Sequence, residues 1–254
     1  MHFAPPRSIV IDLFHCFGAK PAHRVDTSLA AEMLRASGCR HLAVNTHTID
    51  QVTAGDDLPV GYDTATLGSV MALVGEELAL SPVLNINHPT SAAEAVKRTR
   101  QAAQLTGIRV IKLEVLDPGF KLSVNAEVVE AARELTADGF EVWPLITPDA
   151  RTFAQCVELG STMVRVMGSP IGARRGIEPQ HLEPMGEMLV DSPVPVMLDG
   201  GIGSTADVEQ AFALGFQSVL VNSCLFADGT DPVTALAGFR ATVDRVASGT
   251  PAAH

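Results

Sequence analysis

The stretch Arg109-Val110-Ile111-Lys112-Leu113-Glu114-Val115 is a short, mostly apolar run, and residues 125–137 after it repeat their apolar side chains with helical spacing. A second apolar run, Phe140-Glu141-Val142-Trp143-Pro144-Leu145-Ile146, follows directly after Gly139. An apolar strand, an amphipathic helix and another apolar strand make one unit of a parallel sheet. The same order recurs along the rest of the chain.

Eight apolar runs and eight helical patterns alternate in the sequence. The expected strands are residues 8–14, 41–47, 82–87, 109–115, 140–146, 162–167, 194–199 and 218–222. The expected helices are residues 27–37, 67–80, 91–105, 125–137, 150–159, 181–190, 206–214 and 232–247. Eight such pairs predict a single (β/α)₈ TIM barrel domain over residues 1–254, with a short flexible N-terminus and a flexible tail at 248–254. The alternative is an open doubly wound sheet, but no Gly-x-Gly-x-x-Gly motif follows the first strand.

Composition restricts the classes of partner. The formal net charge of −11 argues against nucleic acid and against an anionic membrane surface, and it leaves small molecules open. Because no apolar run reaches about 18 residues and the first residues lack the pattern of a signal peptide, we expect no membrane segment. The cysteines lie far apart without metal-ligand spacing, which favours a reduced, cytoplasmic protein without a metal.

Lys112 stands out because it interrupts an apolar strand. Side chains alternate between the two faces of a strand, so Val110, Lys112 and Glu114 share one face. A lysine amine in a dry pocket has a lowered pKa, and its neutral form can attack a carbonyl to give an imine. The alternative interpretation is a structural ion pair, or an edge strand whose polar face meets water.

The last two expected strands end in residues that suit an anion. Leu198-Asp199-Gly200-Gly201-Ile202-Gly203-Ser204 leads directly into a helix, and Val221-Asn222-Ser223 ends the eighth strand. Glycine loops and helix N-termini bind phosphate in this part of many barrels. The loop Gly168-Ser169-Pro170-Ile171-Gly172-Ala173-Arg174-Arg175-Gly176 adds two arginines, which bind phosphate well. The alternatives are a purely structural glycine turn and arginines that are only solvated.

Asp199 ends the seventh strand, opposite Lys112 if the barrel closes. A carboxylate that faces an imine lysine can move protons or stabilise the iminium. The alternative is that Asp199 caps the next helix.

These motifs, in this order, resemble the thiazole synthase family from about residue 85 to 245. The most specific are Ile111-Lys112-Leu113-Glu114-Val115, Gly168-Ser169-Pro170-Ile171-Gly172, Leu198-Asp199-Gly200-Gly201-Ile202-Gly203 and Val221-Asn222-Ser223. The resemblance implies that Lys112 forms an imine with a ketose phosphate while Glu114 and Asp199 move protons. It implies a sulfur donor, the C-terminal thiocarboxylate of a small ubiquitin-like carrier protein, and no metal or flavin cofactor. The phosphate would lie against Gly172, Gly201, Gly203, Asn222 and Ser223, with Arg174 or Arg175 as helpers.

The first third departs from the family pattern at the ends of three strands. Here the chain reads Phe14-His15-Cys16-Phe17-Gly18, Asn45-Thr46-His47 and Asn85-Ile86-Asn87-His88. These sequences offer hydrogen bonds for sugar hydroxyls, and the candidates are His15, Asn45, His47, Asn85, Asn87 and His88. Each histidine alone is more typical of a structural or surface position than of a substrate site, and it is their coincidence at three adjacent strand ends that favours binding.

We therefore expect a synthase of a secondary-metabolism branch of this family that makes a 2-thiosugar phosphate of the 2-thioglucose 6-phosphate type. The close alternative is thiazole synthase itself, which acts on 1-deoxyxylulose 5-phosphate. A class I aldolase, a flavin-dependent barrel and a non-catalytic barrel that binds a phosphometabolite remain open. Related barrels often associate, so a homo-oligomer is also open.

Overall fold

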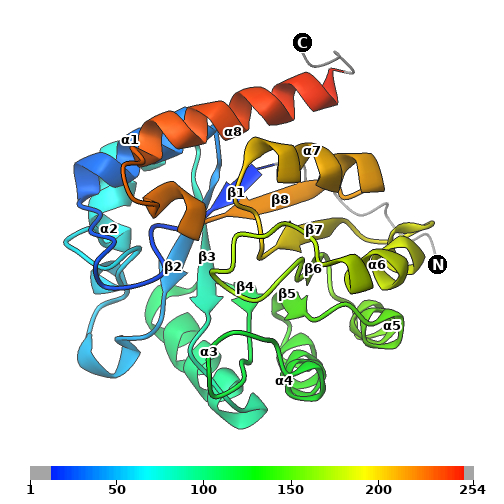
Figure 1. The fold of residues 1–254 in the computed structure, drawn as a ribbon. Helices are drawn as coiled ribbons and strands as arrows, with labels where there is room; N and C mark the ends of the chain where they lie inside the picture. Colours follow the sequence, from blue (N-terminus) through cyan, green and yellow to red (C-terminus); the bar gives the residue numbers. More distant parts are fainter. Residues whose placement is uncertain (1–12, 249–254) are drawn as a thin grey trace, which may run out of the picture.

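The computed structural model describes residues 13–248, and in it eight parallel strands form a ring that α-helices surround (Figure 1). The strands are β1 (Leu13–His15), β2 (His41–Asn45), β3 (Ser81–Ile86), β4 (Val110–Leu113), β5 (Glu141–Ile146), β6 (Val164–Val166), β7 (Val196–Asp199) and β8 (Ser218–Val221). They pair in the order β1-β8-β7-β6-β5-β4-β3-β2. This arrangement confirms the predicted (β/α)₈ barrel. Residues 8–12 of the first expected strand and the tail after Ser248 lie outside the described residues.

The helices follow the strands as the sequence predicts. They are α1 (Thr27–Ser37), α2 (Leu67–Val70), α3 (Ala92–Thr106), α4 (Asn125–Ala137), α5 (Ala150–Glu158), α6 (Leu182–Leu189), α7 (Thr205–Leu214) and α8 (Pro232–Ala247). Side chains that accept hydrogen bonds from backbone N–H groups start several of them, including Asp26, Ser91 and Asp231. The left-handed glycine Gly38 ends α1, and Gly107 ends α3.

The second helix is shorter than expected. An α-helix was predicted over residues 67–80, but α2 ends at Val70 and a π-helix, η3 (Met71–Gly75), continues it. The amide of Leu80 donates to the carbonyl of Gly75, five residues back. The two glycines of this segment, Gly68 and Gly75, weaken the α-helical conformation, so the wider turn replaces it.

Strand alternation separates two apolar layers and leaves a polar layer above one of them. Ile111, Leu113 and Val115 pack outward in the large core between strands and helices. The opposite faces fill the lower part of the barrel with a second cluster, which contains Phe14, Cys16, Cys39, Ala43, Val83, Trp143, Met163, Met197 and Leu220. On five of these strands, the next inward residue toward the carboxyl end is polar. These residues are Asn45, Asn85, Lys112, Arg165 and Asp199.

Residues 59–61 lie between the carboxyl ends of β1 and β2. The amide of Asn45 donates to the carbonyl of Pro59 at 2.7 Å, and Gly61 forms a parallel bridge with Phe17 beyond β1. A Cβ on Gly61 would come 2.9 Å from the Phe17 carbonyl oxygen, so this close approach requires glycine. The loop after β2 therefore forms part of the barrel wall and carries Tyr62 to its mouth.

Candidate active site

A cavity of about 380 Å³ opens at the carboxyl ends of the strands, directly above the apolar cluster inside the barrel. It contains all three predicted catalytic residues, Lys112, Glu114 and Asp199. Its lining comprises Cys16, Gly18, Ala19, Tyr62, Asn85, Asn87, His88, Lys112, Glu114, Leu116, Phe120, Leu145, Ile171, Gly172, Asp199, Gly200, Gly201, Ile202, Leu220, Asn222 and Ser223. Active sites of this fold lie at the same end of the barrel.

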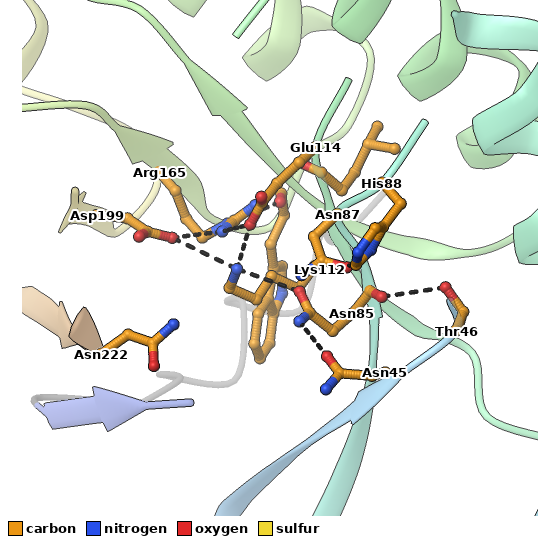
Figure 2. A network of polar contacts seen from close by, with 12 residues as sticks. Asn45, Thr46, Asn85, Asn87, His88, Lys112, Glu114, Arg165, Asp199 and Asn222 are labelled. Atoms are coloured by element: carbon orange, nitrogen blue, oxygen red, sulfur yellow. Dashed lines mark hydrogen bonds and ion pairs between the residues drawn. The ribbon is translucent and has the colours of Figure 1, made fainter. Parts of the chain in front are cut away.

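The Lys112 amine is surrounded by polar groups from three strands (Figure 2). Its Nζ donates to Oε1 of Glu114, which follows β4, and to Oδ1 of Asn85 on β3 at 3.2 Å. Oδ2 of Asp199 on β7 lies 3.7 Å from the same nitrogen. Lys112 is 4% exposed, Glu114 5% and Asp199 7%, so these charges interact in a nearly dry environment.

Arg165 completes this cluster, and the sequence analysis missed it. It lies on the inward face of β6 and is fully buried. Its Nη1 donates to Glu114 Oε1 at 3.1 Å and to Asp199 Oδ2, while its other nitrogens donate to the carbonyls of Trp143 and Leu113. The signal was available, because Arg165 interrupts an apolar strand as Lys112 does.

The charges of this cluster set the pKa of the lysine. Burial and the Arg165 guanidinium lower the pKa of Lys112, but Glu114 and Asp199 outweigh both and raise it above its usual value. The expectation of a lowered pKa is therefore wrong, because it counted desolvation and left out the carboxylates. Burial raises the pKa of Glu114, but Lys112 and Arg165 outweigh burial and hold the pKa below its usual value. The resting state contains an ammonium ion beside carboxylates.

Two of the predicted hydroxyl-binding residues are engaged by the protein itself. Asn85 donates from Nδ2 to Oδ1 of Asn45 at 2.7 Å, and Asn45 donates from its own Nδ2 to the carbonyl of Val60 at 3.1 Å. Figure 2 shows the contacts from Lys112 to Asn85 and from Asn85 to Asn45, and the Asn45 amide extends this chain to the loop after β2. Asn85 lines the cavity, whereas Asn45 lies behind it.

The remaining hydroxyl candidates divide into two groups. Asn87 and His88 line the cavity, and His88 Nδ1 lies 2.7 Å from Asn87 Oδ1. His47 lies behind them and stacks on Tyr62, with 5.4 Å between ring centroids. His15 faces the helices, because its neighbours on β1 face into the barrel, and burial lowers its pKa to about 4. The structure thus separates His15 from the other candidates.

The expected phosphate end is also divided. Gly172, Gly201 and Ser223 line the cavity. Gly201 has a φ of 99°, and a Cβ there would collide with the Gly176 carbonyl, so the loop requires glycine. Gly203 lies outside the lining, and its N–H donates to Asp207 Oδ2 at 2.8 Å. The helix α7 thus uses its own carboxylate as a cap.

Asn222 and the two arginines have different surroundings. The Asn222 side chain accepts from the N–H of Gly18 at 3.0 Å and donates to its carbonyl, so it ties β8 to the loop after β1. Arg175 pairs with Glu178 and is exposed. Arg174 forms no ion pair among the described residues, and its charge reaches Cys224, the neighbour of Ser223. Neither arginine lines the cavity, and of the two Arg174 is the one without an acidic partner among the described residues.

No group of His, Cys, Asp and Glu side chains among residues 13–248 has an arrangement that could hold a metal ion. Within the same range, no helix is both long and apolar enough to cross a bilayer. The arrangement at Lys112 offers an amine, two carboxylates that can exchange protons with it, and a cavity large enough for a small phosphorylated metabolite.

Comparison with known proteins agrees with this site. The family described as thiazole biosynthesis protein ThiG matches residues 63–253. Thiazole synthase of Pelotomaculum thermopropionicum is 30% identical over 213 residues, which cover 83% of this chain and 76% of that protein. Thiazole synthase of Chlorobium phaeovibrioides is 30% identical over 214 residues, covering 84% and 77%. A chain in the crystal structure of the Amycolatopsis orientalis BexX/CysO complex has the same fold, with a TM-score of 0.79, 24% identity and coverage of 99% and 97%.

Proposed function

The chain belongs to the thiazole synthase family, and on this premise we propose that it inserts sulfur into a sugar phosphate held as an imine on Lys112. The observation that carries the proposal is the buried Lys112 amine in contact with Glu114 and 3.7 Å from Asp199, inside a cavity. A buried amine with a carboxylate in direct contact can pass its proton on and become nucleophilic.

Imine formation on this site needs an internal proton acceptor. Glu114 touches the ammonium directly, so it takes the proton and leaves a neutral amine to attack the open-chain carbonyl. Water leaves as the imine forms. Asp199, on the other side of the amine, then moves the proton of the adjacent carbon, and the carbonyl shifts to that carbon. The carrier thiocarboxylate adds its sulfur to this carbonyl carbon, and the acyl group then moves to the former carbonyl oxygen, which leaves as the carrier's carboxylate. The reverse proton shift restores the imine, and its hydrolysis frees the thiosugar phosphate and Lys112.

The phosphate group would lie at the opposite side of the cavity mouth. Gly201 and Ser223 supply small donors, and Arg174 supplies a cation that no acidic side chain among the described residues neutralises. Arginine binds phosphate through two hydrogen bonds from its planar fork. Arg175, held by Glu178, has no such role.

The substrate that we propose is a hexose phosphate, and the product a 2-thiosugar phosphate of secondary metabolism. The family match begins at residue 63, yet Cys16, Gly18, Ala19 and Tyr62 line the cavity from outside that range. Their wall faces Asn87 and His88, which have free polar atoms for sugar hydroxyls. The catalytic residues lie within the matched range and part of the cavity wall lies outside it. This division favours a substrate that differs from that of thiazole synthase.

A small sulfur-carrier protein is the proposed donor. The structural neighbour was solved as a complex of two proteins, BexX and CysO. Near the mouth, Phe120 is 46% exposed and Leu122 41%, which gives a partner's chain end an apolar edge beside the cavity. All four cysteines are buried and none forms a disulfide, in keeping with a cytoplasmic protein that takes sulfur from a donor.

The test is to incubate the protein with glucose 6-phosphate or 1-deoxyxylulose 5-phosphate and to reduce with borohydride. We expect a stable mass gain on Lys112 with the hexose phosphate, no gain in Lys112→Ala, and an unchanged gain in the exposed control Lys97→Ala. A gain with deoxyxylulose phosphate alone would identify thiazole synthase. Cleavage of the sugar without a sulfur donor would identify an aldolase, and a yellow purified protein would identify a flavin enzyme. An undiminished mass gain in Lys112→Ala would reject the imine mechanism.

A further inference from the structure

Arg165 is a permanent cation inside the barrel, and it contacts both carboxylates that surround Lys112. It is fully buried and comes from β6, between the strand that carries Lys112 and the strand that carries Asp199. Nε donates a hydrogen bond to the carbonyl of Trp143 and Nη2 to that of Leu113, and these two bonds fix the plane of the guanidinium. Nη1 alone donates to both carboxylates (Figure 2).

We propose that Arg165 is a positioning residue that balances the charges of Glu114 and Asp199 and so permits Lys112 to release its proton for imine formation. The role in imine formation rests on the proposed function. The charge balance itself stands on the contacts of the four side chains, each less than 10% exposed.

The sign of the effect follows from the charges that face the amine. With Arg165 present, Glu114, Asp199 and Arg165 together carry one negative charge beside Lys112. Without Arg165, Glu114 and Asp199 would carry two negative charges beside Lys112. Each negative charge holds the proton on the ammonium more firmly, because a nearby opposite charge favours the charged form. Arg165 lowers the pKa of Lys112, whereas both carboxylates raise it. The arginine therefore makes the amine easier to deprotonate.

Geometry adds a second effect. Glu114 accepts from Lys112 and Arg165 with the same oxygen, Oε1, and Asp199 meets both cations with Oδ2. Glu114 Oε2 and Asp199 Oδ1 accept no hydrogen bond among the described residues, and both residues line the cavity. Arg165 therefore leaves one oxygen of each carboxylate available for proton transfer to a bound molecule.

The other titratable groups that face the cluster do not replace this charge. Cys16, beyond β1, is a neutral thiol because burial raises its pKa to about 11. Burial also raises the pKa of Tyr62, so its phenol stays neutral, and burial lowers the pKa of His88. Asn85, from β3, carries no charge. Among residues 13–248, Arg165 is thus the cation that offsets the carboxylates beside the lysine.

The experiment measures how readily Lys112 loses its proton, with formaldehyde and cyanoborohydride as the probe. Only neutral amines are methylated, and mass spectrometry gives the rate at each of the four lysines, Lys20, Lys97, Lys112 and Lys121. The readout is the rate at Lys112 divided by the rate at exposed Lys97, between pH 7 and 9. For Arg165→Met we expect this ratio to fall about tenfold, which corresponds to about one unit of pKa. Arg165→Lys, which keeps the charge, should stay within about threefold of the parent.

The result that would overturn the inference is a folded Arg165→Met protein with an unchanged or higher ratio. A merely structural arginine predicts the higher ratio, because a loosened barrel exposes Lys112. If Arg165→Met does not fold, Asp199→Asn and Arg165→Met/Asp199→Asn replace it, since the double variant removes one charge of each sign. The ratio should be higher in Asp199→Asn than in the double variant, and equal ratios would reject the inference. Because formaldehyde requires no sugar, failure of sugar trapping with these ratios as expected would reject the proposed function alone.

Discussion

Replacing Lys112 by methionine should destabilise the barrel, by an amount that depends on pH. Methionine preserves most of the volume, but Glu114 keeps only Arg165 of its two cations and Asn85 Oδ1 loses a donor. Removing one partner of a buried ion pair costs about 3–5 kcal/mol, and here Glu114, Asp199 and Arg165 would keep one negative charge without compensation. At pH 8 we therefore expect the unfolding free energy of Lys112→Met to be lower by about 3–5 kcal/mol.

The deficit should shrink as the pH falls. In the parent, Lys112 and Arg165 hold the pKa of Glu114 below 4.5, so its contribution to stability is present above that pH and is lost in acid. In the variant, Glu114 loses the charge that most strongly lowers its pKa, so burial raises the pKa of Glu114 in the folded protein. The folded variant then binds a proton more readily than the unfolded chain, and its relative stability recovers by about 1.4 kcal/mol for each pH unit below the raised pKa, down to pH 4.5.

Thermal melting at pH 8 and pH 5 tests this reasoning. For a chain of 254 residues, about 1 kcal/mol shifts the melting temperature by roughly 2–4 °C, so the expected difference at pH 8 is roughly 6–20 °C. It should be clearly smaller at pH 5. The exposed control Lys97→Met should melt with the parent at both pH values. A difference for Lys112→Met that is the same at both pH values would refute the charge argument and leave only a packing effect.

Three further predictions concern the cavity and the barrel wall. Arg174→Ala should weaken trapping of a sugar phosphate by about tenfold, the value of one charge-assisted hydrogen bond, whereas Arg175→Ala, whose guanidinium is paired with Glu178, should not; equal effects would reject the assignment. Tyr62→Phe should reduce glucose 6-phosphate affinity about fivefold by calorimetry, since this cavity-lining hydroxyl has no hydrogen bond among the described residues, and unchanged affinity would remove Tyr62 from the site. The pKa of His15 is about 4 in the folded protein and 6.5 in the unfolded chain, so the unfolded chain binds the proton more readily as the pH falls. The free energy of unfolding should therefore decrease by about 2 kcal/mol between pH 7 and 5, and urea denaturation of His15→Leu should lack this decrease.

The barrel was predictable because its signals are local. Apolar runs, helical periodicity and glycines at helix ends each act over a few residues, and β4, α4 and β5 appear where these signals place them. The insertion of residues 59–61 between β1 and β2 was not predictable, because its hydrogen bonds join segments far apart in the chain. The π-helix after α2 was not predictable either, because apolar spacing does not distinguish a π-turn from an α-turn.

The site was predictable only in part, for a reason of the same kind. Alternation along one strand places Lys112 and Glu114 on one face, and the structure agrees. It cannot show which strand residues stand opposite, so the pKa of Lys112 was expected to shift in the wrong direction and Arg165 was overlooked. The direction in which His15 points was not predictable either. Strands that are buried on both faces have continuous apolar sequences, which do not reveal which residues face into the barrel.

The raised pKa of Lys112 has a consequence for the order of events in catalysis. An ammonium ion cannot attack a carbonyl, so Lys112 in the empty site reacts with a stray aldehyde only through its small neutral fraction and therefore slowly. The carboxylates that hold this proton are also the groups that must accept it, and Arg165 weakens their hold without leaving the cluster. In the proposed mechanism, a substrate displaces water from the cavity and offers a carbonyl beside Nζ. The proton then moves to Glu114, because desolvation favours the neutral amine and neutral acid over two separate charges. Reactivity would thus follow binding, which suits the proposed function, in which the site holds an open-chain sugar until a sulfur donor arrives.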